Sequence, residues 1–199
     1  SRRFLNVTVA AMGLVVAAPL MLAVAALIKL TSPGPILFTQ KRIGVDRRHR
    51  ASRLPGNGRR EDDRGGRLFT IYKFRTMEHR EARNEEKWAS EEASRVTAVG
   101  RVLRKYRLDE LPQLVNVLQG DMNLVGPRPE QPEIFRRLSR RVPRYDARQR
   151  VLPGITGLAQ VERGYDCSVE DVRKKAELDL RYIERRSVLE DVRILLKTV

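Results

Sequence analysis

Residues 4–28 read FLNVTVAAMGLVVAAPLMLAVAALI, a run of 25 positions without a charged side chain. As a helix with a rise of about 1.5 Å per residue, this run would be about 37 Å long, more than the roughly 30 Å hydrocarbon core of a bilayer. A cleaved signal peptide is the alternative interpretation, but the run is long for the apolar part of such a peptide. The sequence therefore predicts a membrane helix over residues 1–30.

Two features bear on whether this helix spans the membrane. Arg2 and Arg3 precede the apolar run and Lys29 follows it, so the positive-inside rule gives no strong asymmetry. Pro19 lies inside the run, where a proline removes a backbone hydrogen bond and kinks a helix. A kinked helix that enters and returns to the same face satisfies both facts. A spanning helix with a tolerated proline is equally consistent with the residues.

The remaining residues, 31–199, predict one domain. TSPGP at residues 31–35 stops the helix, and LFTIYKFRTM at 68–77 is typical of an extended segment. Between them, 47–67 holds eight arginines and four glycines and predicts a surface loop insertion. Residues 168–199 predict two amphipathic helices, each starting with a serine capping box.

Composition narrows the partners and excludes several kinds of site. The chain has 199 residues, with 40 Lys+Arg against 25 Asp+Glu and a net charge of +15. This excess predicts an anionic partner, which could be nucleic acid, an acidic membrane surface or phosphorylated substrates. Of the cations 32 are arginines, which favours bidentate contacts to phosphate. One cysteine and two histidines exclude an internal disulfide, a four-thiolate zinc site and a histidine-based metal centre.

Asp109 and Glu110 are the first candidates for chemistry. They stand just before Pro112, and proline is tolerated only in the first turn of a helix, so both carboxylates are expected near the start of a leucine-striped helix within 102–119, which Gly120 ends. Acidic residues at helix starts are commonly caps, and Asp109 suits the N-cap position. Two adjacent carboxylates can also divide labour, one attacking phosphorus and the other holding Mg²⁺.

Two cationic motifs accompany this pair. In GPRP, at 126–129, the flanking prolines immobilise the backbone around Arg128, which lowers the entropy lost when that arginine grips a phosphate. An ordinary proline-rich turn is the alternative. Lys73 and Arg75 are separated by Phe74, and alternation along an extended chain places both cations on one face. Charged strand edges of this kind are also common without function.

Four motifs in this order resemble the bacterial sugar transferase family, the monotopic polyprenol-phosphate phosphoglycosyl transferases. They are KRIG at 41–44, YKFRTM at 72–77, RLDELPQLVNVLQGDMNLVGPRPE at 107–130, and PGITG at 153–157 followed by AQV at 159–161. The resemblance covers nearly the whole chain. One departure follows the last motif, where the chain reads ERGY at 162–165 in place of the Asn-Gly-Arg found in some branches.

The resemblance implies an enzyme that moves a sugar-1-phosphate from a UDP-sugar to undecaprenyl phosphate and releases UMP, as the first membrane step of surface glycan synthesis. By similarity, Asp109 is the nucleophile that forms a covalent aspartyl-phosphosugar intermediate, and Glu110 binds the Mg²⁺ cofactor. The residues expected to bind the phosphates or the nucleotide are Lys73, Arg75, Arg104, Arg128, Gln160 and Arg163.

The same resemblance implies an α/β fold, mostly α, with a small membrane-associated catalytic domain on a kinked re-entrant membrane helix and interfacial amphipathic helices. The enzyme would lie in the bacterial inner membrane with its catalytic domain, residues 31–199, on the cytoplasmic face. Its expected partners are the UDP-sugar, undecaprenyl phosphate and membrane lipids, with a homodimer left open and no nucleic acid. Longer family members carry further N-terminal membrane helices, and a start at Ser1 is compatible with the catalytic part of one.

The residues leave one alternative function and one open question. A non-enzymatic basic membrane adaptor would bind anionic lipid or nucleic acid through the 47–67 loop, and the carboxylate pair would then have no role. The identity of the transferred sugar cannot be read from these motifs, because it depends on the shape of a pocket.

Overall fold

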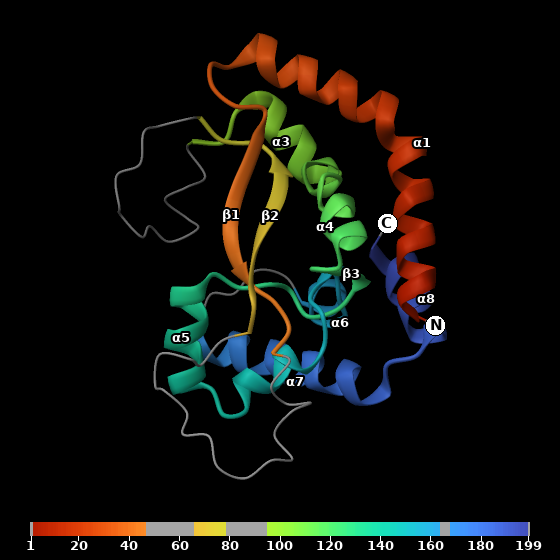
Figure 1. The fold of residues 1–199 in the computed structure, drawn as a ribbon. Coiled ribbons are helices and arrows are strands. Elements are labelled where there is room, and N and C mark those ends of the chain that lie inside the picture. The colour runs from red at the N-terminus through yellow and green to blue at the C-terminus, as the bar shows by residue number, and fades with distance from the viewer. Residues whose placement is uncertain (1, 47–65, 79–94, 164–167, 199) are drawn as a thin grey trace.

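The computed structural model describes residues 2–46, 66–78, 95–163 and 168–198. Within these residues the fold is mostly helical α/β, with one long apolar helix at the N-terminal side and two small sheets (Figure 1). Of the predicted loop insertion, all but Gly66 and Arg67 lies outside the described residues.

Helix α1 (Arg2–Thr31) contains the apolar run and continues unbroken through Pro19. Figure 1 shows it running along one side of the molecule, from α8 at its first turn to beyond α3. Many of its large apolar side chains point away from the protein, with Val15, Val16 and Leu22 more than 70% exposed. By length and composition it could cross a membrane.

Polar contacts fix the first turns of α1 to the rest of the fold. Arg2 pairs with Asp191 of α8 (Val188–Thr198) and donates a hydrogen bond to the hydroxyl of Tyr182 at 3.1 Å. Asn6 is buried, and its Oδ1 accepts from the Leu124 N–H at 2.8 Å. A buried asparagine inside an apolar helix is thereby explained, because it satisfies a backbone donor of strand β3 (Asn123–Val125).

The larger sheet pairs β1 (Leu37–Ile43) with β2 (Leu68–Phe74) in antiparallel register, from Leu37 opposite Phe74 to Ile43 opposite Leu68. The other edge of β2 faces helix α4 (Gln113–Gln119). There the amide of Asn116 accepts from Tyr72 N–H at 3.1 Å and donates to Thr70 C=O at 2.7 Å. One fully buried side chain therefore substitutes for a missing neighbouring strand.

The leucine-striped segment is not one helix. It consists of α3 (Ala98–Lys105), the 3-10 turn η4 (Leu108–Glu110) and α4, because Arg107 adopts a left-handed backbone with φ 53°. The expected N-cap role of Asp109 is therefore wrong: the residue before α4 is Pro112, without a side-chain cap. The expected stop is confirmed, since Gly120 ends α4 with φ 89°.

The second half of the chain surrounds a two-stranded parallel sheet of β3 and β4, in which Asn123 pairs with Gly154 and Val125 with Thr156. The serine caps of the last two helices are confirmed: Ser168 Oγ accepts from Asp171 N–H, and Ser187 Oγ accepts from Glu190 N–H. The remaining elements are α5 (Pro132–Arg141), η5 (Tyr145–Arg150), β4 (Gly154–Thr156), α6 (Leu158–Glu162) and α7 (Val169–Arg185).

The inward face of α1 joins these elements in the core. Near its N-terminal end, Ala10 is fully buried against Phe69 and Val117. Near its C-terminal end, Ile28 packs in a cluster with Phe74 and Leu103. Helix α1 therefore covers the junction between β2, α3 and α4, where the candidate site lies.

We expect Asn116→Ala to destabilise the protein by about 2 to 4 kcal/mol, because Tyr72 N–H and Thr70 C=O lose their partner together. In detergent this should lower the thermal unfolding midpoint by roughly 5 to 10 °C. Gln119→Ala on the same helix is the control, since Gln119 is exposed. Equal midpoints for the two variants would contradict the role given to Asn116.

Candidate active site

Asp109 and Glu110 form the 3-10 turn between α3 and α4. The left-handed Arg107 starts the turn, and Glu110 N–H bonds to its carbonyl at 3.2 Å. Both acidic residues are buried, at 9% and 8% exposure. A buried carboxylate is costly unless it is paired, so the surroundings of this turn must supply positive charge.

Glu110 receives that charge from two cations. Its Oε1 lies 2.5 Å from Nζ of Lys73 and 3.4 Å from Nη1 of Arg128. Burial raises the pKa of the Glu110 carboxyl, but Lys73 and Arg128 together outweigh burial and hold that pKa below its ordinary value. Glu110 is therefore ionised at neutral pH and connects β2 to the loop after β3.

Asp109 has a different environment from its neighbour. Burial raises the pKa of the Asp109 carboxyl above its ordinary value, and the nearby charges of Lys73 and Arg104 only partly oppose it. Among the described residues, no side chain donates a hydrogen bond to this carboxylate. Within the described structure Asp109 thus has a backbone hydrogen bond but no side-chain donor, and its carboxylate is relatively basic, while the oxygen Oε1 of Glu110 is held by cations.

Helix α3 brings Arg104 toward the pair. Thr97 caps this helix by accepting from Gly100 N–H at 2.9 Å. A Cβ at Gly100 would lie 2.0 Å from the carbonyl oxygen of Thr76, so only glycine allows this close packing. Arg104 Nε then donates to Thr76 Oγ1 at 2.9 Å, which fixes the guanidinium within electrostatic range of Asp109.

The loop after β3 carries Arg128. Gly154 N–H donates to the carbonyl of Pro127 at 3.0 Å, and a Cβ at Gly154 would lie 2.0 Å from the backbone nitrogen of Gly126. The two backbones therefore touch at the end of the parallel sheet. From this support the half-exposed side chain of Arg128 reaches Glu110.

Arg75 lies apart from this cluster. Its guanidinium donates to the carbonyl of Pro33 at 2.7 Å, and to the carbonyl and hydroxyl of Ser32 at 2.8 and 2.6 Å. Because β2 ends at Phe74, the alternation expected to align Arg75 with Lys73 does not extend this far. Arg75 holds the turn that follows α1, and these contacts give no support to phosphate binding.

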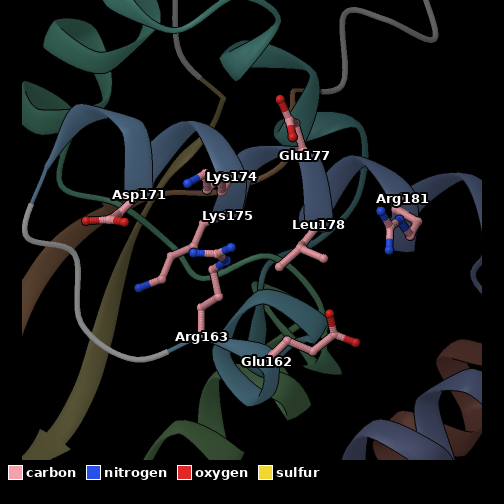
Figure 2. Close-up of a pocket in the computed structure, with 8 residues that line it drawn as sticks. All are labelled: Glu162, Arg163, Asp171, Lys174, Lys175, Glu177, Leu178 and Arg181. Carbon is pink, nitrogen blue, oxygen red and sulfur yellow. The ribbon is translucent and has the colours of Figure 1, made fainter.

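Gln160 and Arg163 lie on and just after α6. Gln160 Nε2 donates to Ile155 C=O at 3.2 Å, while its buried Oε1 has no partner in the described structure. Figure 2 shows Arg163 facing α7, where Lys174 and Lys175 line the same cavity of about 510 Å³. Within the described residues no contact joins either residue to the carboxylate pair.

The structure thus brings part of the predicted set together. Three of the six predicted phosphate-binding residues surround the carboxylate pair: Lys73, Arg104 and Arg128. Sequence reasoning missed Asn116, which sets the distance between β2 and the helix after the carboxylates. Its signal was a polar residue between Val115 and Val117 inside an apolar helical stripe.

The donor set suits a divalent cation shared with a substrate. The described residues contain no group of three or more His, Cys, Asp or Glu side chains that could hold a metal by themselves. Mg²⁺ is commonly held by one or two carboxylates together with substrate phosphates. The described side chains contact Glu110 through Oε1 and leave Oε2 without a hydrogen bond. Glu110 and Asp109 therefore fit such a shared site.

Comparison with known proteins shows the family of the chain. A family model described as bacterial sugar transferase matches residues 1–199. The chain belongs to the bacterial sugar transferase family. This confirms the family inferred from the four sequence motifs.

Several named relatives align with the whole of this chain, which spans only part of their own length. It is 42% identical over 198 residues to a UDP-N-acetylgalactosamine-undecaprenyl-phosphate N-acetylgalactosaminephosphotransferase from Aeromonas hydrophila, and spans 42% of that protein. It is 44% identical to a UDP-glucose:undecaprenyl-phosphate glucose-1-phosphate transferase from Caulobacter vibrioides, of which it spans 68%. A protein of the same name from Escherichia coli is 36% identical, and the chain spans 39% of it.

The lowered pKa of Glu110 has a measurable consequence for stability. A carboxyl whose folded pKa is depressed stabilises the fold above its unfolded pKa, and this contribution is lost as pH falls through the folded pKa. We expect the midpoint difference between the native chain and Glu110→Gln to be largest above the ordinary glutamate pKa of about 4.3, and to shrink as the pH falls below it through the lower folded pKa.

Thermal unfolding in detergent across this pH range measures the difference. Glu133→Gln is the control, because the Glu133 side chain is exposed on α5. A Glu110→Gln difference that does not shrink as the pH falls below the ordinary glutamate pKa would contradict the ion pairs assigned to Glu110.

Proposed function

We propose that this protein transfers a sugar-1-phosphate from a UDP-sugar to undecaprenyl phosphate and releases UMP. The observation that carries the proposal is the unequal carboxylate pair. Asp109, whose pKa is raised by burial, has no side-chain donor among the described residues, and it stands beside Glu110, which is held by Lys73 and Arg128. The names of the relatives support the substrate class, since they combine undecaprenyl phosphate with glucose or N-acetylgalactosamine. The sugar taken by this chain is accordingly proposed to be one of these two.

The proposed reaction has two displacements at the same phosphorus. A carboxylate oxygen of Asp109 attacks the β-phosphorus of the UDP-sugar, the bond from that phosphorus to the bridging oxygen breaks, and UMP leaves. An oxygen of undecaprenyl phosphate then attacks the phosphorus of the aspartyl-phosphosugar. The bond to Asp109 breaks, and undecaprenyl-diphospho-sugar forms. An ionised carboxylate needs no base for the first step.

The cations around the pair suit this chemistry. Negative charge on the diphosphate and on Asp109 must be brought together, and fixed positive groups in a buried site reduce the repulsion. Lys73, Arg104 and Arg128 supply these groups from three different elements. Glu110, with Asp109 beside it, would hold Mg²⁺, which supplies further positive charge for the diphosphate when bound.

The two ends of α1 support a re-entrant topology. Its first turn is held by Asp191, and the turn after its last residue is held by Arg75. Both partners belong to the same folded unit, so a helix that crossed the bilayer would have to break one set of contacts. The exposed apolar side chains between the two ends then face lipid, with the domain on the cytoplasmic side of the inner membrane, where UDP-sugars are made.

The adaptor hypothesis explains less of the structure. A basic lipid-binding module does not need two buried carboxylates, which cost free energy. The 47–67 loop on which that hypothesis depends lies almost wholly outside the described residues. A homodimer stays a prediction.

Asp109→Asn should lower UMP release by at least about 10³-fold, because the amide cannot attack phosphorus. UMP is measured with UDP-glucose and UDP-N-acetylgalactosamine, undecaprenyl phosphate and Mg²⁺ in detergent. Intact mass without the acceptor should show a phosphosugar adduct on the native chain alone. Asp146→Asn, an exposed aspartate, is the control. Native turnover in Asp109→Asn would refute the nucleophile assignment.

The topology proposal predicts that the N-terminus of α1 and the domain that follows α1 are both inaccessible from outside intact spheroplasts. In a Cys167→Ser background, one cysteine is added before Ser1 and another replaces the exposed Glu184 of α7. A membrane-impermeant maleimide should label both only after lysis. Labelling of the N-terminal cysteine in intact spheroplasts would show that the helix spans the membrane.

A further inference from the structure

The backbone of the Arg128 loop is held at every carbonyl from 127 to 130. Pro127 C=O accepts from Gly154 N–H at 3.0 Å, and Glu130 C=O accepts from Ile43 N–H at 3.0 Å. The two carbonyls between them accept from arginine side chains: Arg148 Nη2 donates to Arg128 C=O at 3.2 Å, and Arg42 Nη1 donates to Pro129 C=O at 3.2 Å.

Arg148 has further partners that fix its orientation. Its Nε donates to Oδ2 of Asp179 at 2.7 Å, and its Nη1 lies 3.9 Å from Oε1 of Glu130. The guanidinium carbon stands 4.7 Å from the centre of the Tyr145 ring. The flat guanidinium is therefore directed by η5, α7 and the loop at once, a geometry that a lysine ammonium cannot reproduce.

Burying the Arg148–Asp179 pair costs desolvation free energy. The side chains are only 9% and 2% exposed. Burial raises the pKa of the Asp179 carboxyl, and Arg148 opposes that rise. A buried ion pair is often no more stabilising than well-packed apolar residues of the same size. What it does provide here is a fixed direction for a hydrogen bond to the residue that reaches Glu110.

We propose that Arg148 and Asp179 are positioning residues that hold Arg128 in the geometry in which it grips the substrate diphosphate. Neither residue contacts the carboxylate pair in the described structure, so the pair acts through the backbone of Arg128. The inference rests on the proposed function for the identity of the ligand.

The structure offers a matched control pair between the same two segments. Arg144, directly before η5, lies 4.0 Å from Glu184 of α7, and both side chains are more than 60% exposed. Glu184→Gln therefore removes an arginine–carboxylate pair between the same two segments, a solvent-exposed one with no contact to Arg128.

The test is a double-mutant cycle read by UDP binding, measured calorimetrically with Mg²⁺. Arg148→Lys should weaken UDP binding by about tenfold, and Arg128→Ala at least as much. The double variant should bind no more weakly than Arg128→Ala alone, because Arg148 acts only through Arg128. Glu184→Gln should bind as the native chain does. Asp179→Asn repeats the cycle if Arg148→Lys fails to fold.

The possible results separate the positioning role from the proposed function. Additive losses in the double variant, or native affinity in both Arg148→Lys and Asp179→Asn, overturn the positioning role. A native chain without UDP affinity contradicts the proposed function instead. In that case hydrogen exchange of the Gly126 and Gly154 amides, which donate to Thr156 and Pro127, decides the inference. Faster exchange in Arg148→Lys than in Glu184→Gln supports it, and equal exchange overturns it.

Discussion

Two adjacent carboxylates in a buried turn repel each other and lose their hydration, so η4 is stable only where cations from other segments reach it. The protein meets this requirement from three directions: a strand carries Lys73, a short helix carries Arg104 and a proline-flanked loop carries Arg128. Each of these segments is in turn fixed by a specific polar contact rather than by apolar packing alone. The charge balance of one turn therefore depends on polar contacts in three other segments.

The sequence predicted the features that depend on local chemistry. The apolar length of α1, the serine caps of α7 and α8 and the stop at Gly120 follow from residues close together in the chain. Prediction from the sequence failed where the local structure depends on a single backbone angle or on a partner far away in the chain. Pro112 indicated a helix start near the carboxylates, but a left-handed arginine is rare, so nothing in the sequence indicated the backbone angle of Arg107.

In the candidate site too, the sequence indicated local features and missed contacts between distant segments. The motifs contain the two carboxylates, Lys73 and Arg128, and the family resemblance added Arg104. Arg75 stands in the same motif as Lys73, yet its partners Ser32 and Pro33 lie more than 40 positions away. The pairing of Arg148 with Asp179 spans 31 positions and leaves no periodic pattern in either segment. Such contacts become visible only when the folded backbone is known.

The anchoring of α1 by α8 sets an order of events during synthesis. Arg2 and Asp191 are 189 positions apart. At about 5 to 20 residues per second, roughly 10 to 40 s pass between translation of the helix and translation of the side chain that holds its first turn. Throughout that interval the most apolar segment of the chain is without its last partner. The apolar helix α1 therefore needs lipid or a chaperone long before the rest of the fold can pack against it.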